Sequence, residues 1–233
     1  MINHDEIKKE FSKNIFWLSI PVLAIDIVIF TIFNWKLCVV MTTRNKEPEK
    51  DKFILPGWVV KSWFDLEENF DDILLRKTWI RWIYKEQLYS FGNKNRDPRW
   101  HIVSIAYYAL VDKDNFLKDA DFTKIQLIEY EKLDSTNIWF DHKEIIEYAK
   151  KRLNWKMEYT NIAKNILPTK FSLSLLQNVY EIILWNPLDK RNFRKKILSL
   201  GILAETWELQ KARSNMAKLY EFKDKELKIV DMM

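Results

Sequence analysis

The side chains best suited to binding a polyanion lie in one short segment near the end of the chain. The segment "LDKRNFRKKILSLG", residues 188–201, follows Asn186-Pro187, and proline at such a place is typical of a helix start. With helical spacing, Phe193, Ile197 and Leu200 share one face. The opposite face then carries four cations, Lys190, Arg191, Arg194 and Lys195.

The segments on both sides of this basic helix predict a second helix before it and two strands after it. "FSLSLLQNVYEIIL", residues 171–184, predicts a preceding helix with Ser174 and Gln177 in capping-box spacing. "ILAETWELQKARSNMAKLYEF", residues 202–222, predicts two strands joined by a polar, basic turn. A helix-turn-helix followed by such a wing binds DNA through its second helix. The candidate DNA-binding residues are Lys190, Arg191, Asn192, Arg194, Lys195, Lys196, Lys211 and Arg213.

Charge is distributed in agreement with that unit. Residues 161–233 contain 13 Lys and Arg against 8 Asp and Glu, whereas residues 1–160 contain 25 of each. Excess positive charge in one part of a chain indicates a polyanionic partner, although a solvated basic face is the alternative. The single Cys38 and three scattered His exclude a disulfide framework and a multi-cysteine zinc site, and favour a cytoplasmic protein with neither metal nor cofactor.

Tryptophan and glycine occur in unusual numbers. The chain has 11 Trp and 3 Gly, while soluble proteins average about 7% glycine. Several Trp stand at turns or helix ends, where glycine is favoured: Trp35, Trp58, Trp63, Trp79, Trp155, Trp185 and Trp207. We infer that many are glycines, encoded by UGA and written as Trp. The alternative is a Trp-rich aromatic core.

The first two thirds of the chain predict a mixed α and β domain. Strands are expected within residues 15–33 and over 36–44, 83–91, 101–111 and 124–133, and helices near 65–78 and 141–153. Residues 15–33 are long and apolar enough for a membrane span. The segment is nevertheless rich in β-branched residues and contains Asp26, which favours a strand.

The segment from Leu55 to Ile80 resembles the Nudix box, a loop-helix-loop with the pattern G-x5-E-x7-R-E-U-x-E-E-x-G-U. Placing the first box glycine at Trp58 puts the last at Trp79, followed by apolar Ile80. In this register the metal-binding and neighbouring positions hold other residues: Phe64, Asp72, Ile73, Arg76 and Lys77. Since Mg²⁺ needs hard oxygen ligands, this resemblance implies a Nudix-like domain without a metal and without hydrolase activity.

Residues 22–222 together resemble Nudix-related transcriptional regulators. That resemblance implies an α+β protein: an N-terminal extension (1–21), a Nudix-like α/β/α sandwich that senses an effector (22–155), and a winged helix-turn-helix (156–233). It further implies a homodimer bound to double-stranded operator DNA, with an ADP-ribose-like or sugar effector and no membrane partner. Arg44, Arg96, Asp97 and Arg99 are the candidate effector-binding residues, with a dimer interface or surface ion pairs as alternatives.

Two other functions remain open from the sequence alone. A Nudix hydrolase acting on a nucleoside diphosphate derivative such as ADP-ribose is the first. A membrane-anchored protein, held by residues 15–33, is the second.

Overall fold

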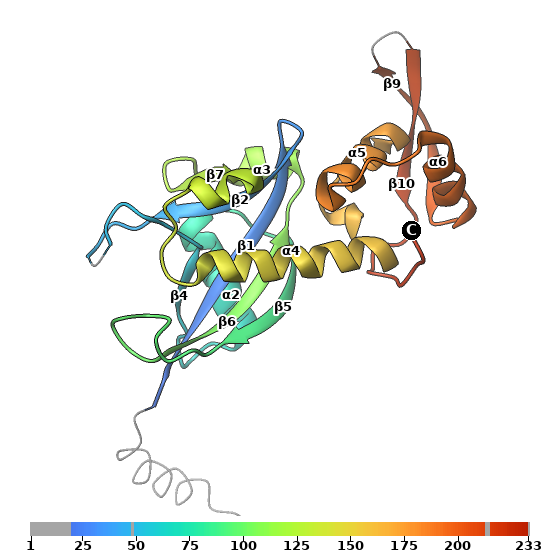
Figure 1. The fold of residues 1–233 in the computed structure, drawn as a ribbon. Coiled ribbons are helices and arrows are strands. Elements are labelled where there is room, and N and C mark those ends of the chain that lie inside the picture. The colour runs from blue at the N-terminus through green and yellow to red at the C-terminus, as the bar shows by residue number, and fades with distance from the viewer. Residues whose placement is uncertain (1–19, 48, 213–214, 233) are drawn as a thin grey trace, which may run out of the picture.

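The protein folds into two α+β lobes joined by one long helix (Figure 1). The structure, a computed structural model, describes residues 20–47, 49–212 and 215–232. The larger lobe contains a mixed sheet with helices on both faces, and the smaller lobe contains two short helices and a hairpin. The predicted fold class is confirmed.

Strand β1 (Val22–Phe33) is the centre of the larger lobe. It pairs in parallel with β6 (Ile102–Leu110), and antiparallel with β2 (Lys36–Thr43) and β4 (Gly57–Val59). The strands β3 (Phe53–Ile54) and β7 (Ile125–Glu129) extend the sheet beyond β2, and β5 (Tyr84–Phe91) pairs with β6. Successive side chains of a strand point to opposite faces, so β1 contributes to two cores.

The two faces of β1 are covered by different helices. Ile25, Ile27 and Ile29 pack with residues of α2 (Leu66–Thr78) and α3 (Lys113–Asp119). Val28 and Phe30 belong to the other core, together with buried residues of α4 (His142–Tyr159). Burial on both faces explains why β1 is apolar almost throughout. It is a strand, as the sequence favoured, and no helix among the described residues is long and apolar enough to cross a membrane.

The smaller lobe has the predicted helix-turn-helix and wing. After a 3-10 turn η2 (Ile162–Asn165), β8 (Phe171–Ser172) leads into α5 (Leu173–Leu184) and α6 (Lys190–Ser199). The wing strands are β9 (Leu203–Ala212) and β10 (Asn215–Phe222), and the sheet order is β8-β10-β9. The expected capping box at Ser174 is wrong: Ser172 is the N-cap and its hydroxyl accepts from the Leu175 amide.

Two other expectations differ in extent. Residues 124–133 form the strand β7 and then a 3-10 helix, η1 (Tyr130–Ser135), rather than one strand. The helix expected to end near residue 153 continues to Tyr159, so the predicted domain boundary after residue 155 lies inside α4. Buried residues of α4, α5 and α6 belong to one hydrophobic cluster with β1 and β2, so α4 is shared by both lobes.

Tryptophan occupies backbone conformations that favour glycine. Left-handed φ values between 54° and 64° occur at Trp35, Trp79, Trp82, Trp185 and Trp207. Trp79 and Trp185 end α2 and α5, where glycine is the common residue. Asn34 and Trp35 form the two-residue hairpin loop between β1 and β2, both with positive φ, as in an Asn-Gly type I′ turn.

The burial of tryptophan excludes the aromatic-core alternative. Of the ten Trp in the part of the chain that the structure describes, nine are exposed and only Trp139 is buried. Not every position fits the glycine inference by backbone geometry, however. Trp155 lies inside α4 rather than at a helix end, and Trp58 lies in β4. Recoded glycine therefore stays a proposal, best supported at the five left-handed positions.

We expect glycine at positions 35, 79, 185 and 207 to stabilise the protein relative to tryptophan. The left-handed conformation costs a residue with a Cβ about 1 to 2 kcal/mol, partly offset by the larger chain entropy of unfolded glycine. Trp155→Gly is the matched control, because glycine inside a helix is unfavourable. Urea denaturation of each variant measures the change. TGG codons at positions 35, 79 and 185 in the gene would contradict recoding.

Candidate functional site

One pocket of about 900 Å³ brings together the four predicted effector-binding residues Arg44, Arg96, Asp97 and Arg99. They come from the end of β2 and from the loop between β5 and β6. Residues of β1, β4, the end of α2 and the start of α4 also line the pocket. Its lining includes seven basic side chains and three acidic ones, so it suits an anionic ligand.

A buried ion network lies at the wall of this pocket. Asp26 of β1 is 7% exposed and accepts hydrogen bonds from Ser104 Oγ (2.6 Å) and an Arg96 Nη (3.2 Å). Arg96 also donates to both carboxylate oxygens of Asp141, at 2.6 and 2.7 Å. These bonds raise the pKa of Arg96 although burial opposes it. Arg96 is therefore fixed between two carboxylates rather than exposed on the surface.

His142 completes the network in its neutral form. The backbone amide of Leu55 donates to His142 Nδ1 at 2.9 Å, which leaves the proton on Nε2, 3.6 Å from Asp26 Oδ1. Burial lowers the pKa of His142 despite the two nearby carboxylates. The sequence suggested no role for His142, Asp141 or Asp26. A carboxylate in the middle of an otherwise apolar strand was the one signal that could have located the network.

Two aromatic side chains, the buried Trp139 and the pocket-lining Phe140, contact arginines of the pocket. Arg44 Cζ lies 4.2 Å from the ring centre of Trp139, and Arg99 Cζ lies 5.4 Å from that of Phe140. Arg99 also donates to both oxygens of Asp97. Burial opposes ionisation of Asp97, but these bonds outweigh it and lower the pKa. Planar guanidinium groups and aromatic rings can stack on a base or ribose, and guanidinium groups can also donate hydrogen bonds to phosphate.

The residues at the box positions have other partners than a metal. Phe64 precedes α2, and Ile73 is buried in the core. Asp72 forms ion pairs with Lys61 and Arg76, which lower its pKa. Arg76 and Lys77, in the last turn of α2, line the pocket. Among the described residues, no group of three or more His, Cys, Asp and Glu is placed to hold a metal ion.

The two adjacent glutamates of this helix also have structural partners. Glu68 and Asp65 form a reciprocal capping box at the start of α2. Glu67 accepts from the Tyr107 hydroxyl at 3.0 Å and pairs with Lys85.

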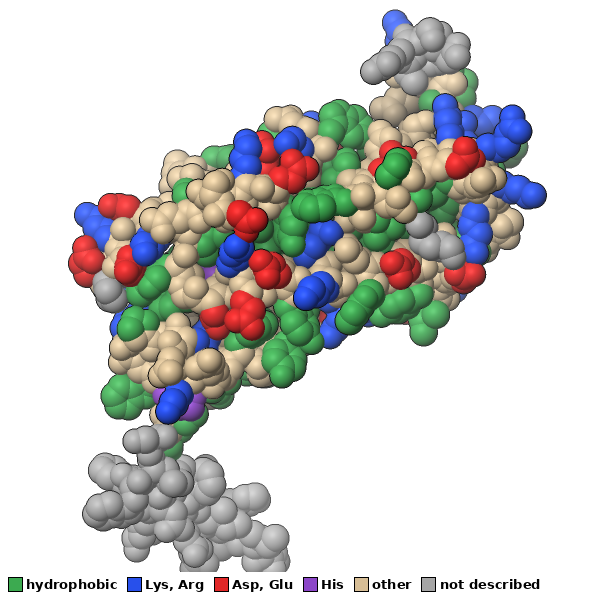
Figure 2. Space-filling model, in the orientation of Figure 1, with side chains coloured by type: hydrophobic (Ala, Val, Ile, Leu, Met, Phe, Trp, Pro, Cys, Tyr) green, Lys and Arg blue, Asp and Glu red, His purple; other side chains and the backbone are tan. Residues whose placement is uncertain are grey.

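The predicted DNA-binding residues gather at the far end of the molecule, where Figure 2 shows a group of Lys and Arg side chains. Lys190, Arg191, Asn192 and Lys195 are exposed on α6, and Lys211 is exposed on β9. Arg194 instead donates to Ser174 Oγ of α5, and Lys196 pairs with Asp231 at 2.9 Å. Arg213 lies outside the described residues.

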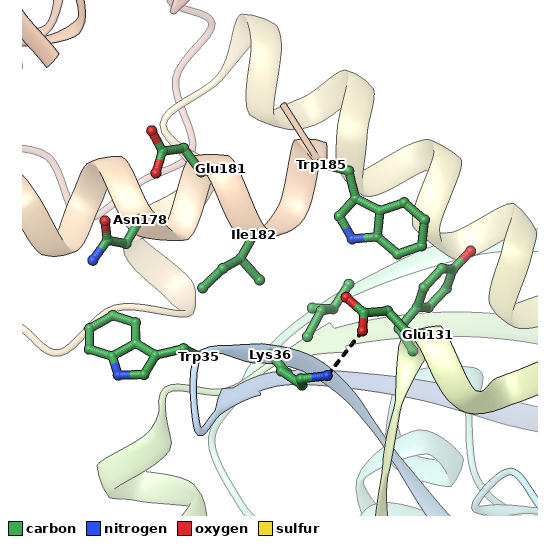
Figure 3. A pocket seen from close by; sticks show the side chains of 9 residues that line it. Trp35, Lys36, Glu131, Asn178, Glu181, Ile182 and Trp185 are labelled. Atoms are coloured by element: carbon green, nitrogen blue, oxygen red, sulfur yellow. Dashed lines mark hydrogen bonds and ion pairs between the residues drawn. The ribbon is translucent and has the colours of Figure 1, made fainter. Parts of the chain in front are cut away.

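A second, smaller pocket of about 390 Å³ lies where α5 meets the β1–β2 hairpin and η1 (Figure 3). Lys36 of the hairpin pairs with Glu131 across one wall. Beside it, the buried Lys150 of α4 donates to the Ile183 carbonyl at 2.6 Å and to Asn154 at 2.7 Å. Burial lowers the pKa of Lys150 to about 8. This lysine ties α4 to the C-terminal end of α5.

A Nudix-like domain with a basic pocket, joined to a winged helix, defines a class of ligand-sensing regulators of transcription. The family described as the NrtR DNA-binding winged helix domain matches residues 163–222. The chain is 32% identical over 209 residues to an ADPR responsive transcriptional repressor of Acinetobacter baylyi, covering 87% of this chain and 82% of that protein. The chain therefore belongs to the NrtR family of Nudix-related transcriptional regulators.

Solved structures agree with this assignment over both lobes. Shewanella oneidensis NrtR in complex with a 27mer DNA is 29% identical, with a TM-score of 0.80 over 86% of this chain and 93% of that one. The Nudix domain of the same protein in complex with ADP ribose is 25% identical, with a TM-score of 0.56 over 65% of this chain and 99% of that one. A MutT/nudix family protein of Enterococcus faecalis, 20% identical with a TM-score of 0.68, covers 96% of this chain and 100% of its own and shows the shared fold.

We expect Gly57→Ala to destabilise the larger lobe by about 1 to 3 kcal/mol, because overpacking displaces the buried network. A Cβ at Gly57 would lie 2.3 Å from Asp26 Oδ1 and 2.8 Å from the Ile25 carbonyl oxygen. Gly92→Ala is the control, since its Cβ would meet only Val103 at 3.8 Å. Thermal denaturation compares them, and equal midpoints would contradict the tight contact at Asp26.

Proposed function

We propose that this protein is a transcriptional repressor that binds operator DNA as a homodimer and releases it when ADP-ribose occupies the basic pocket. The observation that carries the proposal is the presence, on one chain, of a basic pocket and a basic second helix of a helix-turn-helix, connected by α4. The relatives support it, since one is ADPR responsive and another was solved with DNA and with ADP ribose.

The pocket has the chemistry that a nucleoside diphosphate sugar requires. Its cations suit the diphosphate, while Phe140 and the guanidinium groups of Arg44 and Arg99 offer flat surfaces for the base or a ribose. Diphosphate hydrolysis by a metal-dependent route needs carboxylate ligands, and the box positions offer Phe64, Arg76 and Lys77 in their place. Binding without turnover follows.

The exposed side chains of α6 divide into two roles. Arg191 and Asn192 suit base edges, because Arg pairs bidentately with guanine and Asn with adenine. Lys190, Lys195 and Lys211 suit phosphates and fix the position of the helix in the major groove. Arg194 and Lys196 need to leave Ser174 and Asp231 before they contact DNA. A two-fold dimer would present two such helices to half-sites about one helical turn apart or a multiple of it.

Helix α4 is the element through which the two sites communicate. Its first residue, His142, and the preceding Asp141 belong to the ion network at the pocket. At the middle of α4, Lys150 donates to the Ile183 carbonyl at the end of α5, and at its last residue the Tyr159 carbonyl accepts from the Val230 amide of the C-terminal segment at 2.8 Å. A ligand that displaces Arg96 or Asp141 would move the helix that supports the DNA-binding lobe.

Substitutions on α6 should separate base contacts from phosphate contacts. Arg191→Ala is expected to weaken operator binding by about 1 to 3 kcal/mol and to relax preference at particular base pairs. Lys195→Ala should weaken all sequences alike and reduce the salt slope by about one. Fluorescence anisotropy at two salt concentrations, with promoter and random duplexes, measures both. Lys151→Ala, exposed on α4, is the control. Equal affinity of the unchanged protein for the promoter duplex and the random duplex would refute the proposal that it is a repressor.

A substitution at the lobe junction should reduce the coupling between effector and DNA. Lys150→Met removes the donor to the Ile183 carbonyl, and an unsatisfied buried acceptor costs about 1 to 3 kcal/mol. We expect ADP-ribose to bind this variant normally but to lower its operator affinity less than in the unchanged protein, where coupling of about 5- to 150-fold is typical. Lys151→Met is the matched control. If ADP-ribose lowers operator affinity equally in Lys150→Met and in the unchanged protein, communication through the Lys150 contact between α4 and α5 is excluded.

A further inference from the structure

Lys77 is a half-buried cation without a carboxylate partner among the described residues. It lines the large pocket from the last turn of α2, and its Nζ lies 4.7 Å from the ring centre of Trp58. Burial lowers its pKa, and the charges of Arg76 and Lys46 lower it further. Two like charges beside a partly desolvated lysine are unfavourable unless an anion is bound between them.

Four other cations of the pocket have carboxylate partners. Arg96 pairs with Asp26 and Asp141, and Arg99 pairs with Asp97. Arg76 pairs with Asp72, and Lys124 with Asp121. Lys46, like Lys77, forms no ion pair in the part of the chain that the structure describes; its position on the β2–β3 loop brings its charge toward the end of α2. Unbalanced positive charge is therefore concentrated at Lys46 and Lys77.

The acidic side chains of the pocket are poorly placed to compete for a cation. Asp26 and Asp97 already accept hydrogen bonds from Arg96 and Arg99. The remaining acidic residue in the lining is Glu47. A divalent ion bound by one or two free carboxylates would have to approach against Arg76, Lys77 and Lys46. The electrostatics of this wall favour an anion directly on the lysines.

We propose that Lys46 and Lys77, assisted by Arg76, hold the diphosphate of the effector directly, so that the effector binds without a divalent cation. This inference rests on the proposed function and specifies how its ligand is recognised. The ammonium groups supply both the charge and the hydrogen-bond donors that a diphosphate needs. No bond to phosphorus is made or broken, and the ligand is released unchanged.

A simpler role for Lys77 would be to interact with the carbonyl groups at the end of α2, since cations stabilise helix C-termini. Lys118 tests that role, because it is an exposed lysine in the last turn of α3, outside the pocket lining. Both Lys77→Gln and Lys118→Gln remove one charge from a helix C-terminus. Only Lys77→Gln should affect ligand binding.

The test is calorimetric titration of the full chain with ADP-ribose, in buffer with EDTA and in buffer with MgCl₂. It is carried out with and without the substitution Trp58→Gly, because the ring of Trp58 contacts Lys77. We expect equal affinity in the two buffers, and at least about a tenfold loss in Lys77→Gln or Lys46→Gln, as for a lost hydrogen bond to a charged group. Lys118→Gln should bind normally, and inorganic pyrophosphate should compete in EDTA.

The outcomes separate this inference from the proposed function. ADP-ribose binding that requires MgCl₂, or that is equally strong in Lys77→Gln with a normal melting temperature, overturns direct recognition by lysine and leaves the repressor standing. No ADP-ribose binding in either buffer overturns the proposed function itself. Equal loss of binding in Lys118→Gln and Lys77→Gln would show that both act only through stability, and would also overturn the inference.

Discussion

The buried carboxylate of Asp26 is the constraint on which the rest of the larger lobe depends. Side chains alternate along β1, so Asp26 shares the face of Val28 and Phe30, the face that α4 covers. It meets Ser104 of β6, Arg96 of a loop and His142 of α4, and it leaves no room for a side chain at position 57. A buried charge that loses its partner destabilises a fold by about 3 to 5 kcal/mol. The folded lobe therefore requires all of these segments to be packed around Asp26.

The same constraint explains how α4 begins. Asp141 is the N-cap residue, yet its side chain makes no capping bond and instead holds Arg96. The positive end of the helix dipole then faces a region that already contains two carboxylates, which is favourable for both. Anchored there, α4 runs 18 residues, a length of about 27 Å at 1.5 Å per residue. Such a helix can transmit a shift at the pocket because its middle is bonded to α5 through Lys150 and its last residue is bonded to the C-terminal segment.

Local patterns predicted most of the longer helices and strands, but they did not predict which distant segments meet. The helix-turn-helix, the wing and the box helix depend on apolar spacing and turn signals within short windows, and the structure has all of them. The ion network joins Asp26 to Arg96 and His142, separated by 70 or more residues, and no local signal reports such a meeting. The helix end expected at Trp185 is present, with the positive φ that such an end needs, whereas the turn expected at Trp155 is not, because buried residues on both sides of it continue the helix.

Both sites of the molecule suit phosphate, and the difference between them lies in how the cations are held. On α6 the lysines extend into solvent on one helix face, which suits a long and uniformly charged duplex. In the pocket they converge from separate segments on one concave wall, which suits a small diphosphate and excludes a rigid duplex. An effector therefore cannot act by competing for the DNA surface. It has to act through elements that connect the two lobes, and α4 is such an element, because it begins at the pocket and is bonded through Lys150 to α5, the helix on which α6 packs.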